Sequence, residues 1–305
     1  MNREKLKDAF EYFENRMNSC DLCARNCMVN RKENKGVCGQ GVNAKITNAI
    51  LHFGEEPPLV GIGIGGAGAI FFSGCGMRCV YCQNFGFSQL NVGKAIDDES
   101  LADVFMKLQK AGAKTLDFVT PEPHLRAILH ALIIASENGF NLPIVFNTSS
   151  YVNVETLAHL DGIVDIYLAD IRYTDDEMGK KYSLVPNYWT VTQRSLREMY
   201  RQVGPFKEER MSGLIVRHLI LPNRIAGSEK AMRFIAEELS TSVPVSLMSQ
   251  YFPVYKALKI KEISRKIDDD EYIEALDMLE KYNLEGWYQP LHEKMKGVYA
   301  KSIER

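Results

Sequence analysis

The sequence lacks the marks of a membrane or exported protein. Its 305 residues contain no run of about 18 apolar residues, the length that a transmembrane helix requires. The opening residues MNREKLKDAFEYFENR are charged and helical in pattern, whereas a secretory signal has a basic segment followed by an apolar one. We therefore expect a cytoplasmic location and no membrane partner.

The chain also has little net charge. Its 37 Lys and Arg residues nearly balance 39 Asp and Glu residues, for a formal net charge of −2. This balance argues against a general nucleic-acid or membrane-surface binder, although it leaves local contacts with either open. The contents of 46% hydrophobic and 25% charged residues are close to those of globular proteins, so composition does not indicate disorder.

Cysteine is absent after Cys82. The seven cysteines are an odd number, and six of them stand in close-spaced sets. Such spacing is typical of metal ligation rather than of a disulfide framework.

From Ala69 onward, short apolar runs alternate with helical stretches, a pattern that predicts βα units and a parallel sheet. Six such units are too few for an eight-stranded barrel, so we predict an α/β fold, a partial (βα)6 barrel of parallel strands with its chemistry at their carboxyl ends. The expected strands are Ala69–Ser73, Thr115–Val119, Leu142–Phe146, Val164–Ala169, Gly213–Leu221 and Val243–Met248. The expected helices include Ser100–Ala111, His124–Asn138, Asn187–Gln202 and Ser228–Leu239.

Three segments follow from this pattern. Residues 1–68 hold an N-terminal helix and a four-cysteine metal-binding module, 69–250 the partial barrel, and 251–305 a C-terminal helical extension that caps one end. Residues 20–68 are rich in Gly, Cys and Pro without a long periodic stretch, so we expect a metal- or loop-stabilised module there. The C-terminal segment is helical in pattern around Asp268–Tyr282.

The segment AIFFSGCGMRCVYCQN leads from an apolar strand into Cys75-x3-Cys79-x2-Cys82. Three thiolates in one loop can converge on one metal centre. A structural zinc normally takes four protein ligands, whereas a cubane held by three cysteines leaves one iron open to another ligand. Buried thiols that only fill the core explain this spacing poorly. The stronger alternative is a closed zinc site that borrows a fourth cysteine from the N-terminal set.

This loop resembles that of the radical S-adenosylmethionine (SAM) superfamily, in which C-x3-C-x-aromatic-C follows the first strand of a partial barrel. Tyr81 fills the aromatic position. The chain resembles in particular the glycyl-radical-enzyme activases and a group of pyruvate formate-lyase activating-enzyme-like proteins. The resemblance implies that Cys75, Cys79 and Cys82 hold a [4Fe–4S] cluster whose open iron binds SAM. One electron then cleaves SAM to a 5′-deoxyadenosyl radical, which abstracts hydrogen from the substrate.

The same resemblance assigns polar residues near the strand ends to SAM. Glu122 stands where the family carries a Gly-Gly-Glu motif that contacts the SAM amino group, although both glycines are missing. The segment from Asn147 to Ser150 resembles the one that holds the SAM carboxylate or ribose. The ordinary alternative is a turn and helix start for Glu122 and a turn or capping role for the segment from Asn147. The predicted cofactor-binding set is Tyr81, Glu122, Asn147, Thr148, Ser149, Asp170, Arg172, Arg217 and Gln250.

The fifth expected strand places Arg217 and His218 in an apolar run, and side-chain alternation sends them to opposite faces. The resemblance makes Arg217 a SAM contact. His218 is more simply explained as a core histidine with its hydrogen bonds satisfied.

A second set, Cys20-x2-Cys23-x3-Cys27-x10-Cys38, supplies four thiolates that can enclose one metal. Zinc, a mononuclear iron and an auxiliary [4Fe–4S] cluster all accept four cysteines, so the spacing leaves the metal open. The glycine run Gly61–Gly66 formally matches G-x-G-x-x-G, but it precedes a strand instead of following one, which excludes a dinucleotide fingerprint. It is better interpreted as a connector or flap.

The leading hypothesis is a radical SAM enzyme, in particular a glycyl-radical activase. This function would require an electron donor such as a flavodoxin or ferredoxin, and a protein substrate. Radical chemistry on a small molecule, a peptide or RNA is an alternative. The competing class is a non-enzymatic iron–sulfur or zinc protein, which would not need polar residues at successive strand ends.

Overall fold

The computed structural model describes residues 2–61, 65–291 and 303–304. The chain divides into two compact units, Met1–Met77 with Asn84–Tyr167, and Arg78–Gln83 with Leu168–Arg305. This division does not follow the three segments expected from the sequence, which remain a prediction. Residues 62–64 of the glycine run lie outside the described residues.

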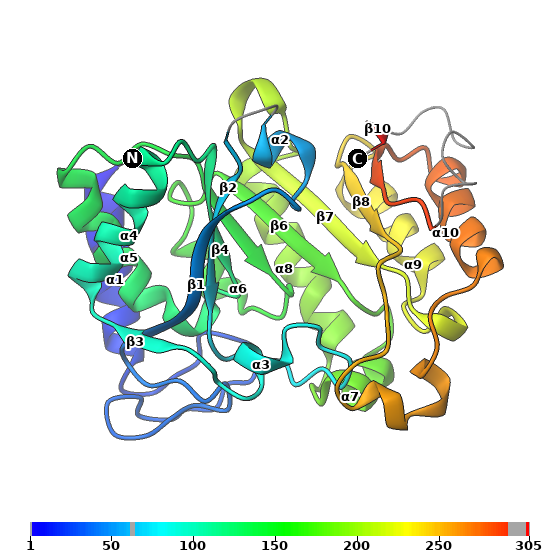
Figure 1. Ribbon diagram of the computed structural model, residues 1–305, viewed down its shortest axis with the longest axis horizontal. Coiled ribbons are helices and arrows are strands. Elements are labelled where there is room, and N and C mark those ends of the chain that lie inside the picture. Colours follow the sequence, from blue (N-terminus) through cyan, green and yellow to red (C-terminus); the bar gives the residue numbers. More distant parts are fainter. Residues whose placement is uncertain (1, 62–64, 292–302, 305) are drawn as a thin grey trace. The chain divides into compact units, whose positions relative to one another are not determined.

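The first unit carries the strands β1 (Ala44–His52), β2 (Ala67–Phe72), β3 (Lys94–Ile96), β4 (Thr115–Val119) and β5 (Ile144–Thr148), in the order β3-β1-β2-β4-β5 (Figure 1). Strands β2, β4 and β5 are parallel, whereas β1 is antiparallel to both β2 and β3. The three parallel strands are almost wholly buried, as expected for a sheet covered on both faces.

Three helices of this unit pack together, namely α1 (Arg3–Arg16), α4 (Asp98–Lys110) and α5 (Leu125–Glu137) (Figure 1). Asn2 caps α1, and Asp97 caps α4 by accepting a 2.7 Å hydrogen bond from the Ser100 backbone N–H. Arg126 of α5 binds Glu14 of α1 at 2.8 Å and also Asp98 of α4. The shorter helical elements are α2 (Pro57–Val60), α3 (Phe85–Ser88), η1 (Glu122–His124) and α6 (Val154–Ala158).

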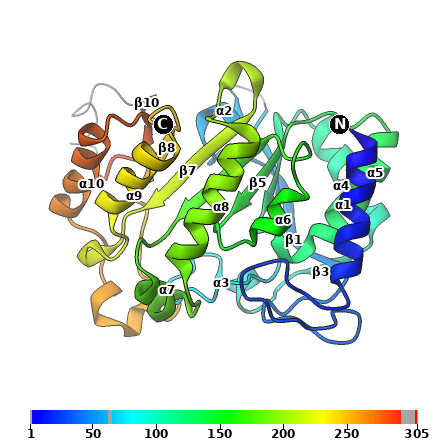
Figure 2. The same cartoon turned by 180° about the vertical axis from the view of Figure 1, so that it is seen from behind.

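Strand β6 (Ile166–Ile171) begins in the first unit and ends in the second, which adds β7 (Gly213–Leu219), β8 (Val245–Met248), β9 (Gly286–Tyr288) and β10 (Ile303–Glu304). The pairs β7/β8, β8/β9 and β9/β10 are parallel. Helix α8 (Tyr188–Val203) packs on β7, as Figure 2 shows from behind. The other helices of the unit are α7 (Asp176–Ser183), α9 (Ser228–Phe234) and α10 (Asp269–Lys281).

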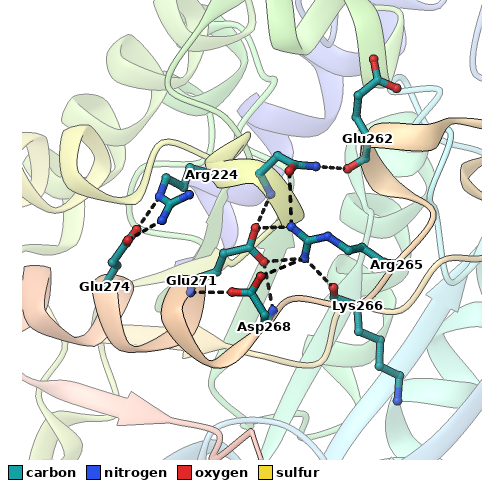
Figure 3. Close-up of polar contacts among 8 residues, drawn as sticks. Arg224, Glu262, Arg265, Lys266, Asp268, Glu271 and Glu274 are labelled. Atoms are coloured by element: carbon teal, nitrogen blue, oxygen red, sulfur yellow. Dashed lines mark hydrogen bonds and ion pairs between the residues drawn. The ribbon is translucent and has the colours of Figure 1, made fainter.

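Helix α10 is tied to the loop after β7 (Figure 3). The Arg265 guanidinium donates to both carboxylate oxygens of the buried Glu271, at 2.7 and 2.8 Å. The Asn223 backbone N–H donates to the same carboxylate at 2.5 Å. Asn223 and Arg224 both have positive φ, +59° and +55°, so these bonds offset the strain of a left-handed turn. The loop that continues β7 is thereby fixed to the C-terminal helix.

The α/β class with mostly parallel strands is confirmed, and each of the six expected strands is present with its bounds moved by at most a few residues. A helix around Asp268–Tyr282 is also confirmed, as α10, while its role as a cap stays a prediction. Residues 20–68 show no long periodic stretch in the sequence, yet they contain the nine-residue strand β1. The pairing of β1 with β2 has an irregular register between Ile46 and Asn48. This irregularity interrupts the alternation of inward and outward side chains by which a strand is recognised in a sequence. Among the described helices, none is long and apolar enough to cross a membrane.

Candidate metal centre and cofactor site

The first unit fixes the entrance to the three-cysteine loop. At the end of β2, the Ser73 backbone N–H donates to the Lys45 carbonyl at 2.8 Å. The Ser73 carbonyl accepts a 2.8 Å bond from His124 Nε2, and because a carbonyl only accepts, the hydrogen is on Nε2. Burial lowers the pKa of His124 to about 3, so this ring is neutral at physiological pH. The residues before Cys75 are therefore held without any metal.

Gly74 explains why glycine precedes the first cysteine. Its φ is +81°, a conformation that disfavours other residues. A Cβ there would lie 2.5 Å from Gln40 Nε2 and 2.6 Å from the Cys38 carbonyl oxygen. Its backbone N–H donates to the Phe87 carbonyl at 2.9 Å. A larger residue at this position would displace the chain that enters the loop.

The second unit holds the other two cysteines of the loop against the end of α7. The Val80 N–H donates to the Tyr182 carbonyl at 2.8 Å, and the Arg78 N–H donates to the Ser183 carbonyl at 3.0 Å. The Cys82 N–H closes a turn on the Cys79 carbonyl at 3.3 Å. Hydrogen bonds on both flanks thus fix the backbone around Cys79.

Cys79 is buried, and its Sγ lies 3.0 Å from Ser183 Oγ. Burial raises the pKa of the Cys79 thiol, while the nearby positive charge of Arg172 opposes the shift. A metal bound to this sulfur would hold it as the thiolate. The buried Tyr81 packs edge-on against Tyr173 and Tyr251, with ring centroids 6.3 and 5.7 Å away. In this environment Tyr81 shapes the loop through its ring.

Glu122 and Thr148 meet in the first unit, where the Thr148 hydroxyl donates to a Glu122 carboxylate oxygen. Both side chains are buried. Asn147 lies beside them on β5 and donates to Asp117 at 3.3 Å. Strand β5 runs through Thr148, two residues beyond its expected end, so Asn147 and Thr148 belong to the strand rather than to the turn after it. A buried carboxylate at a strand end suits a cationic ligand group.

Asp170 and Arg172 pair directly in the second unit, at 2.6 Å. Strand β6 extends through Ile171, so Asp170 lies inside it and not after it as expected. The Tyr188 hydroxyl donates to the Asp170 carbonyl at 3.2 Å and accepts from the Arg172 N–H at 3.0 Å. The charge pair is therefore fixed by the first turn of α8.

Arg217 and His218 take opposite faces of β7, as predicted. His218 is fully buried, with Nδ1 2.9 Å from the Ile171 carbonyl and Nε2 2.9 Å from Ser228 Oγ. Burial lowers its pKa to about 4. Its identification as a satisfied core histidine is confirmed, while Arg217 is only partly buried.

Gln250, at the end of β8, is exposed. Its carbonyl accepts a 3.0 Å bond from Gln83, the residue after Cys82, and its side chain accepts from Gln289 at 3.2 Å. It is thus linked to the three-cysteine loop within the second unit, although by its backbone rather than by its side chain.

The four front cysteines line one small cavity of about 20 Å³ in the first unit, together with Cys75, Glu122 and Ser149. A Cβ at Gly36 would lie 3.3 Å from Cys38 Sγ and 3.5 Å from Cys27 Sγ, so these two sulfurs are close to each other. Arg25 of the same module donates to the Gly76 carbonyl at 2.7 Å. The module therefore packs directly against the residue that follows Cys75.

The donor chemistry of this cavity fits a thiophilic metal. Burial raises the pKa of the Cys23 thiol to about 12 and raises that of Cys20, where the guanidinium of Arg31 acts in the opposite direction. Arg31 Nη1 lies 3.9 Å from Cys20 Sγ. In the part of the chain that the structure describes, no group of three or more His, Cys, Asp or Glu side chains is arranged so that it could hold a metal ion.

Sequence reasoning missed three residues around these sites, namely His124, Ser183 and Arg31. His124 could have been found, because it stands two residues after Glu122 at the same strand end. Ser183 carries no such signal, since it is one of many serines in helical stretches.

Comparison with known proteins bears on the same residues. The family model described as Radical SAM superfamily matches residues 69–201, which include all three loop cysteines. Two proteins of Methanocaldococcus jannaschii, both described as uncharacterized, are similar over most of their length. MJ0674 is 34% identical over 285 residues (90% of this chain, 78% of the other), and MJ0808 is 24% identical over 275 residues (81% and 74%).

Among solved structures, methylornithine synthase (PylB) aligns with a TM-score of 0.49 and 15% identity. The alignment covers 70% of this chain and 61% of that one, which is less than two-thirds of its length.

The family implies a [4Fe–4S] cluster and SAM, and the donor set of three cysteines in one anchored loop fits that group. On the family match and the extensive similarity to MJ0674, this chain belongs to the radical SAM superfamily and is an enzyme of the radical SAM type.

Proposed function

We propose that Cys75, Cys79 and Cys82 hold a [4Fe–4S] cluster with which this protein cleaves SAM reductively. The observation that carries the proposal is the loop itself, in which three thiols within eight residues are anchored by β2 at one end and by α7 at the other. Three cysteines leave one iron open to SAM. When bound, the cluster supplies the electron that breaks the sulfonium bond and releases the 5′-deoxyadenosyl radical. The protein binds, orients and shields the reactants.

The chain's own residues would position SAM. The Glu122 carboxylate accepts the Thr148 hydroxyl, and the SAM ammonium could be a second donor to it. The amide of Asn147 and the hydroxyl of Ser149 would serve the carboxylate or ribose. In the second unit, Asp170, Arg172, Arg217 and Gln250 complete the proposed cofactor-binding set, with Tyr81 packed beneath the loop.

The proposed substrate class is a glycyl radical enzyme, on the strength of the sequence resemblance to activases. A flavodoxin or ferredoxin would then be the electron donor, in a cytoplasmic setting. Hydrogen abstraction from a small molecule, a peptide or RNA is the alternative within the same chemistry.

We further propose that Cys20, Cys23, Cys27 and Cys38 bind a second metal, because all four line one cavity. Zinc, mononuclear iron and an auxiliary cluster differ in their spectra, so metal analysis and Mössbauer spectra of the purified protein separate them.

The cluster assignment is tested by electron paramagnetic resonance (EPR) of the anaerobically reconstituted and reduced protein, with and without SAM. If SAM binds the open iron, it will change the spectrum of the reduced cluster. A front-cysteine quadruple variant serves as control, because only the three-cysteine cluster should respond. If the EPR spectrum of the reduced cluster does not change when saturating SAM is added, the proposal is contradicted.

A further inference from the structure

The buried serine at the end of α7 is placed to act on the proposed cluster. Ser183 is fully buried, and its hydroxyl oxygen lies 3.0 Å from Cys79 Sγ and 2.8 Å from the Tyr173 hydroxyl. The three groups form a short chain within the second unit, Tyr173 to Ser183 to Cys79.

The backbone holds Ser183 in this place. Its carbonyl accepts from the Arg78 N–H at 3.0 Å, and the neighbouring Tyr182 carbonyl accepts from the Val80 N–H at 2.8 Å. The next residue, Leu184, ends α7 in a left-handed conformation with φ of +53°. The residues on both sides of Cys79 are thus hydrogen-bonded to the end of α7 that carries Ser183. The backbone therefore holds the side chains of Ser183 and Cys79 next to each other.

The direction of the hydrogen bonds follows from the donor inventory. A hydroxyl has one hydrogen, and a metal-bound cysteine sulfur has none, so it can only accept. The Ser183 hydrogen must then point to Cys79, and the Tyr173 hydroxyl donates to the oxygen of Ser183. Hydrogen bonds in such a chain polarise one another, which strengthens the donor that faces the sulfur.

A donor to a cluster sulfur favours the reduced state. One-electron reduction by a low-potential donor adds negative charge to the cluster, part of which resides on its sulfurs, and hydrogen bonds to those sulfurs tune its reduction potential. Because Cys79 is buried, water does not compete for this sulfur, so the contribution of Ser183 is weakly screened.

We propose that Ser183, positioned by Tyr173, donates a hydrogen bond to the Cys79 sulfur and raises the reduction potential of the cluster bound there. Ser183 is a positioning and tuning residue and not a catalytic one. The inference rests on the proposed function, since it requires the cluster on Cys79.

The test is an EPR-monitored redox titration of the full-length, anaerobically reconstituted protein. We expect the midpoint potential of Ser183→Ala to be more negative than that of the wild type, and Ser183→Thr to restore it because the hydroxyl is kept. Tyr173→Phe should shift the potential in the same direction by less. The matched control is Ser195→Ala, a fully buried serine of α8 that donates to the Val191 carbonyl at 3.1 Å, which should leave the potential unchanged.

A second measurement detects the hydroxyl hydrogen of Ser183 directly. In the reduced wild type, pulsed EPR should detect a weakly coupled proton that exchanges in deuterated buffer, and Ser183→Ala should lose that signal. An unchanged potential in Ser183→Ala with the cluster loaded would overturn the inference and leave the proposed function intact. If Ser183→Ala does not load a cluster, the Tyr173→Phe variant provides the test. A cluster in Tyr173→Phe with the same midpoint potential as the wild type would then overturn the inference. A wild type that holds no cluster on the three-cysteine loop would overturn both.

Discussion

The two cysteine sets of this protein are held in different ways. The front set lies in turns between α1 and β1, and its four cysteines line one cavity, together with Cys75 and the buried Arg31. The three-cysteine loop instead leaves a buried strand at one end and is bonded to α7 at the other. A site built from turns depends on its metal for its structure, whereas a loop anchored by regular elements keeps its place with an open coordination position. The difference supports our proposal of a reactive role for the three-cysteine loop, and it leads us to propose a structural or accessory role for the front set.

The largest effect should come from the three-cysteine loop. Cys75→Ala, Cys79→Ala and Cys82→Ala are each expected to remove one cluster and all SAM cleavage, because three ligands contain no redundancy. Iron analysis measures the loss of the cluster, and a 5′-deoxyadenosine assay measures the loss of SAM cleavage. Any one of the three variants that cleaves SAM at the wild-type rate would refute the assignment of ligands.

The front set should behave as an independent centre. A Cys20/Cys23/Cys27/Cys38 quadruple alanine variant is expected to lose its metal and to melt at a lower temperature, because metal binding stabilises a module that consists of turns. The iron and the EPR signal of the three-cysteine cluster should remain. A folded variant that has lost the SAM-responsive cluster as well would show that the two sets form one centre. Zinc alone in this site would assign the front set a structural role.

The neighbouring residues Arg217 and His218 provide a matched pair on one strand. Arg217→Ala, like Asn147→Ala, should weaken SAM binding by about 1–3 kcal/mol for each lost buried hydrogen bond, more if charged, and leave folding and iron content nearly unchanged. This corresponds to roughly five-fold to more than a hundred-fold in Kd. His218→Ala removes two buried hydrogen bonds and should lower the melting temperature while SAM affinity in the folded fraction stays near normal. SAM titrations and melting curves would show the reverse pattern if we have chosen the wrong face.

The last expected effect is a pH dependence of stability. Burial holds the pKa of His124 at about 3 and that of His218 at about 4, below the ordinary value of 6.5. Below pH 6.5 the unfolded chain takes up protons that the folded chain excludes, so stability is lost as pH falls from 6.5 towards these values. Each histidine contributes up to about 1.4 kcal/mol per pH unit in this window. Denaturant unfolding of the wild type should show this slope, and His218→Gln should flatten it; equal slopes would contradict a buried neutral His218.

The sequence predicted the parallel strands well because they are buried on both faces and appear as largely apolar runs. The structure reproduces the expected bounds of Thr115–Val119 even though Asp117 interrupts its apolar run. Sequence reasoning missed β1, whose alternation an irregular register interrupts. The predicted ends of β5 and β6 are each two residues too early, because the polar residues Asn147 and Asp170 lie inside strands that continue past them.

The site shows the same limits. Cysteine spacing points to ligands because metal geometry constrains residues that are close in the chain. The bond from Ser183 to Cys79 joins residues about a hundred positions apart, and it depends on where α7 ends. The helix ends at Leu184, whose backbone is left-handed. Leucine has no preference for turns, so the sequence does not indicate that the helix ends there.

The most direct test of radical chemistry on the three-cysteine loop is a count of products. Wild-type protein, reconstituted anaerobically and reduced, is incubated with SAM, and 5′-deoxyadenosine and methionine are quantified beside the Cys79→Ala variant. We expect the wild type to form both products in equal amounts and Cys79→Ala to form neither. A cluster-loaded wild type that leaves SAM intact, or a Cys79→Ala variant that cleaves it equally well, would contradict the account.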